Sequence, residues 1–428
     1  MNDSNGEGAM PDEQQHRGAE GGMPDPYPPT VRVERSTVAA LLADSAPAPT
    51  VRPGEVAKAR SRPWVWLVLL ALVAGVASAG WFGWPLYQRY FKTTWIVDAS
   101  GGGDTLTIAE AVSRAPDSAT VLVRPGTYAE SLELDRPVHL KAAETGDQAP
   151  LVAPPEGPCV VARAAAGSIV GLRLRGAAPA EAGPPEAVPC LDIVASGVLV
   201  EGNEIESPSG PGIRLRDGAA PTIRTNTITG AGGPGVLVSA GARGAILDNT
   251  IEGTGGSGIV VRGGSAPEII GNVIADSGAA GVLFAEAAGG RFENNVIRSS
   301  AGSGIEIGTS ADPVVTGNRI ESAGQAGIFV YDLGKGRFRD NAIVSSGYSG
   351  LVIAAGGAPD FATNLVRDSA EHGILAIGRG GGVIDDNTVR DNKGHGIALA
   401  KDTDVELGEN TLEGNKEPQV LDGWVTGF

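Results

Sequence analysis

The sequence of 428 residues is poor in several residue types, and each shortage excludes a class of protein. Only two cysteines are present, so the chain is not a small scaffold held by many disulfides. With four histidines in all, no zinc-finger spacing can be assembled. Basic residues number 33 against 50 acidic ones, and the net charge of −17 argues against binding nucleic acid, although it is compatible with cations or neutral glycans.

Glycine and proline, in contrast, are abundant. There are 64 glycines and 29 prolines, but no strict three-residue glycine period, which excludes collagen. Glycine at this density excludes helix bundles as well, because each glycine inside a helix costs about 1 kcal/mol. The composition therefore predicts a β-rich protein with a turn every few residues.

The first 92 residues predict a membrane anchor. Residues 1–62 are rich in Gly, Pro, Ser and acidic residues without an apolar period, which is typical of a disordered tail. Residues 63–88 carry no charge and are long enough to span a bilayer as one helix. Three basic residues precede the span closely and two follow it, which predicts a cytoplasmic tail and an extracytoplasmic domain over 94–428 in a bacterial-type cell membrane. The alternative is a signal peptide cleaved after Ala79, but its leading segment of about sixty residues is far too long.

An asparagine recurs at every twenty-third position in the second half of the chain, and a glycine stands nine positions after each of the first nine asparagines. We call these two sets the Asn ladder and the Gly ladder. The Asn ladder comprises Asn203, Asn226, Asn249, Asn272, Asn295, Asn318, Asn341, Asn364, Asn387 and Asn410. The Gly ladder comprises Gly212, Gly235, Gly258, Gly281, Gly304, Gly327, Gly350, Gly373 and Gly396. A fixed period of this length indicates a repeat architecture.

Apolar residues share this frame, at two positions after and three positions before each ladder Asn. Short alternating segments such as Gly258-Ile259-Val260-Val261 predict β-strands, and we expect turns at Asn and Gly because both tolerate a left-handed backbone. One unit cannot bury its own apolar face, so the units must stack about 4.8 Å apart. The sequence predicts an all-β parallel β-helix of about thirteen coils. Pro and Gly alternate at the position eighteen after each ladder Asn, which adds a second period twice as long as the first.

The start of the solenoid is less regular. Thr107 and Glu110 have the spacing of a capping box, which predicts a short helix that covers the first coil. Cys159 and Cys190 have the same separation along the chain as Leu172 and Asn203, so both cysteines are expected in one column with Ile213. The distance between adjacent rungs, about 4.8 Å, lies within the range of Cα–Cα distances that a disulfide allows. Two alternatives stay open here, a Cys159–Cys190 disulfide and two buried free thiols.

These features resemble the right-handed parallel β-helix repeat proteins of the pectate-lyase-like superfamily. Asn-x-Ile followed by Gly-Ile/Val-x-Val carries the resemblance over about 200–412. The opening also resembles the N-terminal cap of pectin-methylesterase-like members, through Val97-Asp98, Gly103-Asp104, Thr107-Ile108 and Val123-Arg124-Pro125-Gly126-Thr127-Tyr128. The resemblance implies the fold but not one activity, because the fold hosts lyases, hydrolases, esterases, epimerases and non-catalytic binders. None of the family's catalytic signatures is complete in this sequence.

Two constellations are weak catalytic candidates. His372 and His395 share a column, near Asp368 and Asp391, and such groups can bind a metal or transfer protons. A stripe beside the Asn ladder, which a calcium-assisted lyase would need, contains Glu293, Arg339, Asp340, Asp385, Asp386 and Glu409. Most of its members are two rungs apart, about 9.6 Å, which is loose for one calcium ion. Solvated surface charge is therefore the favoured interpretation of both sets.

An apolar column on the outside of one sheet is the stronger hypothesis. Its candidate binding residues are Leu283, Phe329, Tyr331, Val352 and Leu375. Aromatic rings there can stack on sugar rings or on a partner's side chains. The sequence thus favours a membrane-anchored, non-catalytic protein that binds envelope polysaccharide or a protein partner. A lyase, epimerase or hydrolase acting on polysaccharide is the alternative, and a sensor phosphorylated at Ser36, Thr37 or Thr50 is a third, weaker hypothesis.

Overall fold

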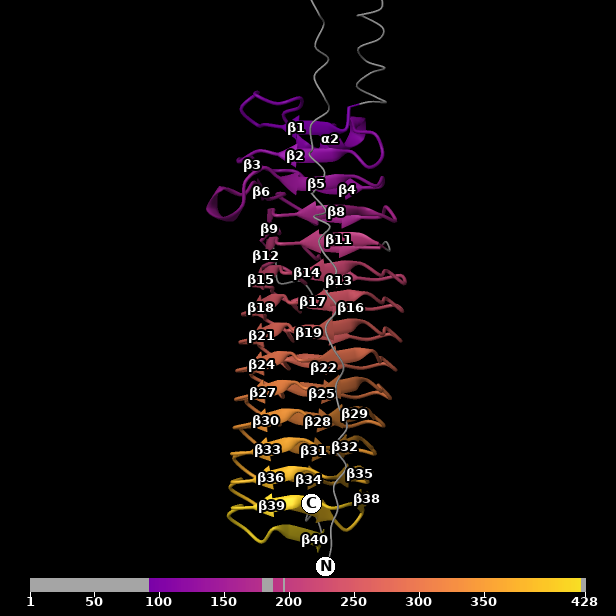
Figure 1. Ribbon diagram of the computed structural model, residues 1–428, viewed down its shortest axis with the longest axis vertical. Helices are drawn as coiled ribbons and strands as arrows, with labels where there is room; N and C mark the ends of the chain where they lie inside the picture. The colour runs from indigo at the N-terminus through magenta and orange to yellow at the C-terminus, as the bar shows by residue number, and fades with distance from the viewer. Residues whose placement is uncertain (1–91, 179–187, 195–196, 425–428) are drawn as a thin grey trace, which may run out of the picture. The chain divides into compact units, whose positions relative to one another are not determined.

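The computed structural model describes residues 92–178, 188–194 and 197–424, and in this part the chain winds as a parallel β-helix (Figure 1). The predicted tail at 1–62 and the predicted transmembrane helix at 63–88 lie outside the described residues. Among the residues described, no helix has the length and apolarity that crossing a bilayer requires.

Each coil contributes one short strand to each of three parallel sheets, named A, B and C in the order in which a coil meets them. Sheet A contains β1 (Thr94–Val97), β2 (Thr120–Val123), β5 (His139–Ala142), β8 (Gly167–Val170), β11 (Val198–Glu201), β14 (Thr222–Arg224), β17 (Ala245–Leu247), β20 (Glu268–Ile270), β23 (Arg291–Glu293), β26 (Val314–Thr316), β29 (Arg337–Arg339), β32 (Asp360–Ala362), β35 (Gly381–Asp385) and β38 (Asp404–Leu407).

Sheet B contains β3 (Thr127–Tyr128), β6 (Leu151–Val152), β9 (Arg173–Arg175), β12 (Glu204–Glu206), β15 (Thr227–Thr229), β18 (Thr250–Glu252), β21 (Val273–Ala275), β24 (Val296–Arg298), β27 (Arg319–Glu321), β30 (Ala342–Val344), β33 (Leu365–Arg367), β36 (Thr388–Arg390) and β39 (Thr411–Glu413). Sheet C contains β4 (Leu132–Leu134), β7 (Val160–Ala162), β10 (Leu191–Ile193), β13 (Ile213–Leu215), β16 (Val236–Val238), β19 (Ile259–Val261), β22 (Val282–Phe284), β25 (Ile305–Ile307), β28 (Ile328–Val330), β31 (Leu351–Ile353), β34 (Ile374–Ala376), β37 (Ile397–Ala400) and β40 (Val420–Trp424).

The register of the strands follows the period of the Asn ladder, so identical positions stack in columns. Ile223 pairs with Ile246 in sheet A, and Ile228 pairs with Ile251 in sheet B. These side chains are fully buried in one continuous core. The prediction of a parallel β-helix with one ladder period in each coil is confirmed. In the described part of the chain, sheet A has 14 strands and sheets B and C have 13 each.

The Asn ladder forms a chain of hydrogen bonds between coils. The side-chain oxygen of Asn249 accepts from both the backbone and the side-chain nitrogen of Asn226, each at 2.9 Å. The side-chain amide of Asn249 also donates to the backbone oxygen of Ile223 at 3.0 Å. Asn249 is 1% exposed. Leaving one such buried group unpaired costs about 1–3 kcal/mol, so every ladder residue secures its neighbours.

The expectation of a left-handed backbone at the ladder Asn and Gly residues is wrong, because none of these residues has a positive φ. The left-handed residue of this turn precedes the ladder Asn and varies in type, as at Thr225 (φ 52°) and Asp248 (φ 51°). The Gly ladder instead reflects close approach. A Cβ on Gly235 would lie 2.4 Å from Cγ2 of Ile251 and 2.7 Å from the backbone oxygen of Gly258. Only glycine leaves room for the aliphatic side chain of the next coil.

The first coil is covered by the predicted helix, α2 (Ile108–Arg114), which packs against β1, β2 and β4. The hydroxyl of Thr107 accepts from the backbone of Glu110 at 3.3 Å. The carboxylate of Glu130 accepts from the first two backbone amides of the helix, at 2.7 and 2.9 Å. These bonds satisfy amides that a helix start otherwise leaves unpaired. A 3-10 turn, η1 (Gly146–Gln148), follows in a later loop.

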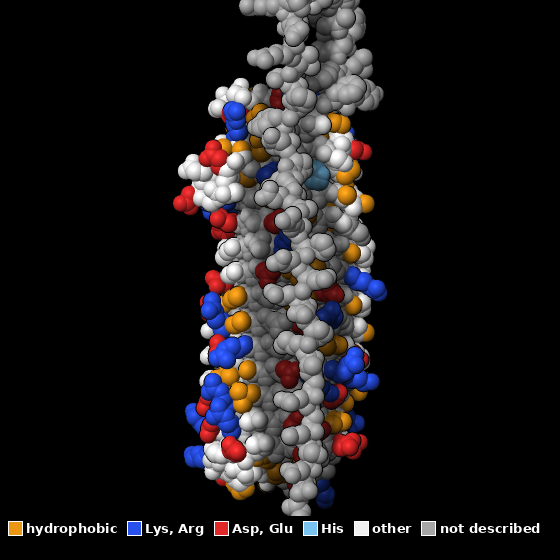
Figure 2. Space-filling view, viewed as in Figure 1, with side chains coloured by type: hydrophobic (Ala, Val, Ile, Leu, Met, Phe, Trp, Pro, Cys, Tyr) orange, Lys and Arg blue, Asp and Glu red, His pale blue; other side chains and the backbone are white. Residues whose placement is uncertain are grey.

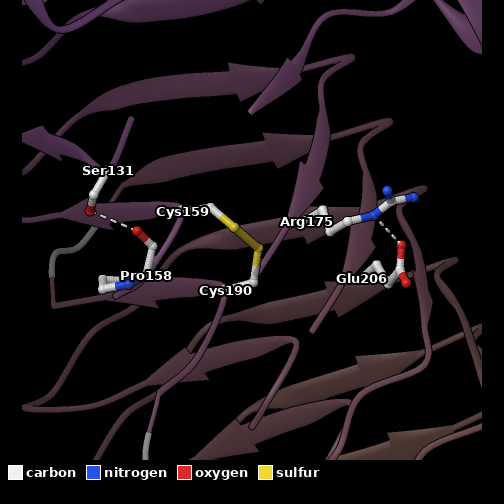
Figure 3. Close-up of a disulfide and its surroundings, with 6 residues drawn as sticks. All are labelled: Ser131, Pro158, Cys159, Arg175, Cys190 and Glu206. Atoms are coloured by element: carbon white, nitrogen blue, oxygen red, sulfur yellow. Dashed lines mark hydrogen bonds and ion pairs between the residues drawn. A yellow bond between two sulfur atoms is a disulfide. The ribbon is translucent and has the colours of Figure 1, made fainter. Parts of the chain in front are cut away.

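Cys159 and Cys190 form a disulfide between adjacent coils (Figure 3). Their Cα atoms are 4.9 Å apart, and both side chains are fully buried. The predicted alignment of the two cysteines with Ile213 was wrong by one residue. Leu191 pairs with Ile213, so Cys190 stands in the column of Gly212. The reason is that the chain from β10 to β13 is one residue shorter than the period of the Asn ladder.

Candidate functional site

The outer side of sheet C carries a continuous column of mostly apolar residues, one from the middle of each strand. In each strand the flanking residues fill the interior, as Ile328 and Val330 do in β28, so the middle residue faces outward. The registered pairs Leu283–Glu306, Glu306–Phe329, Phe329–Val352 and Val352–Leu375 place these residues in one line. We call this line the outer column. It contains four of the five predicted binding residues, and Tyr331 lies just after β28.

Part of the outer column forms a second hydrophobic cluster, separate from the core inside the coils. Its members are Ala326, Val352, Leu375 and Ala398, with Phe329, Ile377 and Leu421 packed against them. Val352 is 5% and Leu375 2% exposed. The outward apolar residues therefore pack on one another along the stack, and Phe329 lies at the edge of this cluster.

Phe329 and Tyr331 form an aromatic pair at the border of this hydrophobic cluster. Their ring centroids are 4.6 Å apart and the planes are inclined by 23°. The ring of Tyr331 lies across Gly308 of the preceding coil, where a Cβ would be 2.7 Å from Cζ and 3.0 Å from Oη. Burial, followed by the charges of Glu306 and Asp332, raises the pKa of Tyr331. The pair is thus held in place by a glycine and by β28.

Glu306 interrupts the apolar column directly beside this pair. Burial raises the pKa of Glu306, and the neighbouring Ser303 offsets only part of that effect. Within the described part of the chain, no basic side chain contributes to this pKa. Glu306 is not among the site residues predicted from the sequence. The available signal was its position as the only charged residue in an otherwise apolar run of the column.

His372 and His395 are brought together, as the column prediction required. Their rings stack with centroids 5.3 Å apart, and Nδ1 of His372 accepts from the backbone of His395 at 3.0 Å. Nδ1 of His395 lies 2.8 Å from the backbone oxygen of Pro418, so it carries a proton. Burial, followed by the charge of His395, lowers the pKa of His372, although Glu371 and Glu417 act in the opposite direction.

The acidic stripe lies elsewhere, at the turn from sheet A to sheet B, and is not joined to the histidines. Arg339 donates to the carboxylate of Asp360 at 2.6 Å, and Asp385 accepts from the backbone of Glu409 at 2.9 Å. Asp340 and Asp386 occupy the left-handed turn positions, with φ of 56° and 51°. No group of three or more His, Cys, Asp or Glu residues suited to a metal ion occurs in the described part. Acidic and basic side chains are intermixed on the face shown in Figure 2.

The comparisons with known proteins agree with this architecture. A family described as "Right handed beta helix region" matches residues 190–274, 211–366 and 287–423, together more than half of the chain. No curated protein matches the sequence.

Solved structures share the fold at low sequence identity. The catalytic unit of an α-1,3-glucanase from Streptomyces thermodiastaticus aligns with a TM-score of 0.54 and 15% identity, over 74% of this chain and 65% of that one. A double mutant of a periplasmic alginate epimerase aligns with a TM-score of 0.49 and 11% identity, over 68% and 77% of the two chains. The A-module of a mannuronan C-5 epimerase from Azotobacter vinelandii gives 0.48 and 17%, over 74% and 93%. These neighbours are polysaccharide-active β-helix enzymes.

Proposed function

Because the chain belongs to the right-handed β-helix family, whose members include binders as well as enzymes, we propose that it binds polysaccharide of the cell envelope through the outer column of sheet C. The observation that carries this proposal is the Phe329–Tyr331 pair at the border of an outward apolar cluster. Ligand sites are mostly apolar surfaces with a few placed polar groups, and Glu306 beside the pair fits that description.

The test is binding of the full-length protein to a glycan array, compared with the Phe329→Ala variant. Removing the Phe329 ring leaves only the ring of Tyr331 for stacking, and we expect affinity to fall about tenfold, equivalent to about 1.4 kcal/mol. Val383→Ala is the matched control, because Val383 is an outward apolar residue of sheet A that is 36% exposed. Equal binding by wild type and Phe329→Ala contradicts the proposal. A blank array together with Phe329-dependent capture of a protein would assign the face to a protein partner instead.

Catalysis on polysaccharide is the alternative outcome, and the arrangement of the candidate residues supports it less. Arg339 is already engaged by Asp360, and the acidic stripe and the two histidines lie on different turns of the coil. Calcium-dependent release of unsaturated uronate from polyuronates would favour the enzyme. Inertness on the same substrates would favour the binder.

The proposal includes a membrane anchor at 63–88, with 1–62 in the cytoplasm and 94–428 outside. The Cys159–Cys190 disulfide supports an oxidising, extracytoplasmic compartment for the β-helix. A reporter that is active only outside the membrane should be active when fused after residue 428 and inactive when fused before residue 1. The same activity at both ends contradicts this orientation, and a mature N-terminus after Ala79 contradicts an uncleaved anchor.

A further inference from the structure

The charges around the aromatic pair are informative about the ligand. From β22 to β37, the strands of sheet C contain no Lys or Arg, and neither do the residues directly flanking them on the Gly-ladder side. Glu306 is the only charged residue within these strands. Beyond the other border of the face, Arg262 follows β19, two coils before the coil of Glu306, and Lys335 lies in the loop after β28.

Geometry places Glu306 and the aromatic pair together. Glu306 is registered directly against Phe329 across one rung, which is a spacing of about 4.8 Å. The Tyr331 ring lies across Gly308, two residues after Glu306 on the same coil. One sugar unit on the rings therefore lies within reach of the Glu306 carboxylate and the Tyr331 hydroxyl.

We propose that this face selects an uncharged glycan, with a sugar ring on the Phe329–Tyr331 pair and its hydroxyl groups donating to Glu306. This inference rests on the proposed polysaccharide-binding function and narrows its ligand class. Sugar hydroxyls are donors that an ionised carboxylate accepts, and hydrogen bonds to a charged acceptor are the stronger ones.

A polyuronate, in contrast, is disfavoured on this surface by its negative charge. Its carboxylates would lie beside Glu306 and would find no Lys or Arg within the strands of β22–β37 to pair with. Like charges at a half-buried site repel each other strongly, because water screens them poorly there. Glu306 thus acts as a specificity-determining group that disfavours acidic glycans.

The experiment measures the affinity of the full-length protein for two sets of oligosaccharides. The neutral set contains α-1,3-, α-1,4-, β-1,3- and β-1,4-glucans, mannan and xylan; the acidic set contains polygalacturonate, polymannuronate and polyguluronate. We expect a neutral member to bind at least about tenfold more tightly than any acidic one, a difference of about 1.4 kcal/mol. Its affinity should change less than about twofold between low and high salt, because no ion pair is screened. An acidic glycan that binds equally well or better overturns this inference and leaves the proposed function standing, whereas binding to neither set contradicts the proposed function.

The role of Glu306 is tested with Glu306→Gln, which keeps the size and an acceptor oxygen but removes the charge. The ratio of neutral to acidic affinity should narrow at least about tenfold. Glu413→Gln removes a charge from β39 of sheet B and should leave the ratio unchanged. Tyr331→Phe, which retains the ring, should weaken neutral binding severalfold and provides a second variant if Glu306→Gln does not fold. An unchanged ratio in a folded Glu306→Gln, or unchanged neutral binding in Tyr331→Phe, overturns the assignment.

Discussion

At the scale of single residues, the Gly ladder shows how one missing Cβ sets the spacing of a whole solenoid. Gly258 approaches the next coil so closely that a Cβ would lie 2.3 Å from Cγ2 of Ile274 and 2.7 Å from the oxygen of Gly281. The first contact is a buried side chain and the second is backbone, so neither can move without shifting a rung. The glycine is therefore a packing requirement and not a source of flexibility.

This leads to a prediction for Gly258→Ala. We expect the variant to lose about 3 kcal/mol of unfolding free energy, the upper range for overpacking a well-packed site. Gly289→Ala is the matched control, because its Cβ would meet only the oxygen of Asp312 at an ordinary 3.5 Å. That variant should stay within about 0.5 kcal/mol of the wild type. Denaturant unfolding followed by circular dichroism checks both, and equal stability of the two variants would contradict the packing argument.

The sequence placed these residues correctly because each column keeps one residue type over many coils. It did not reveal the left-handed position, because Thr225, Asp248 and Asn294 fill that position with different side chains. A period is visible only where one residue type is required. The left-handed turn accepts several types, since the ladder Asn that follows supplies the hydrogen bonds.

At the scale of elements, the loops before β34 and β37 are joined by the His372–His395 contact. Nδ1 of His372 must be unprotonated to accept the backbone N–H of His395. The pKa of His372 is lowered in the folded state from its ordinary value of 6.5. The unfolded chain therefore takes up this proton at higher pH than the folded one. The stabilising contribution of neutral His372 is present above pH 6.5 and is lost as the pH falls below it.

Amide hydrogen exchange at His395 provides the measurement. The protection factor of this amide, corrected for intrinsic exchange, should decrease between pH 7.5 and pH 5.5. In His372→Asn, whose side-chain oxygen can accept the same N–H, protection should be independent of pH over this range. A protection factor that stays constant in the wild type would contradict the link between protonation of His372 and this hydrogen bond. Loss of protection centred above pH 6.5 would show that Glu371 and Glu417, which oppose the shift, dominate.

The candidate site could be predicted only in part at this scale. Alternation along each strand and the period of the Asn ladder together predict that Leu283, Phe329, Val352 and Leu375 share an outward column, and the register confirms it. That pattern does not predict how a side chain extends over the neighbouring coil. The position of Tyr331 over Gly308 and the resulting proximity to Glu306 depend on a local gap that only the structure shows.

At the scale of the whole solenoid, the alternation of Pro and Gly with a period of two coils has a structural cause. At the position eighteen residues after each ladder Asn, a coil with Pro is followed by a coil with a Gly that has a positive φ. Pro221 precedes Gly244 (φ 145°), and Pro267 precedes Gly290 (φ 100°). A Cβ on Gly290 would lie 2.3 Å from the backbone oxygen of Pro267. The unit of the stack is therefore a pair of coils, which explains why Pro and Gly alternate.

Two deletions that end at the same junction test this pairing. Removing residues 249–294, which make up two coils, joins Asp248 to Asn295 and keeps the order Pro221, Gly244, Pro313. Removing residues 272–294, which make up one coil, joins Gly271 to Asn295 and sets Pro313 against Pro267. Proline fixes φ at about −65° and cannot adopt the positive φ that the structure has at this place.

In a simple additive stack, the protein that loses one coil should be more stable than the protein that loses two. The pairing argument reverses that order. We expect the two-coil deletion to unfold at the higher denaturant concentration, with the one-coil deletion less stable by about 3 kcal/mol, the effect of a proline at a site that rejects it. Both variants retain the Glu306–Phe329–Tyr331 site, so retained glycan binding reports folding of that region in each. Stability that falls in proportion to the number of coils removed would mean that single coils, rather than pairs, are the units of this solenoid.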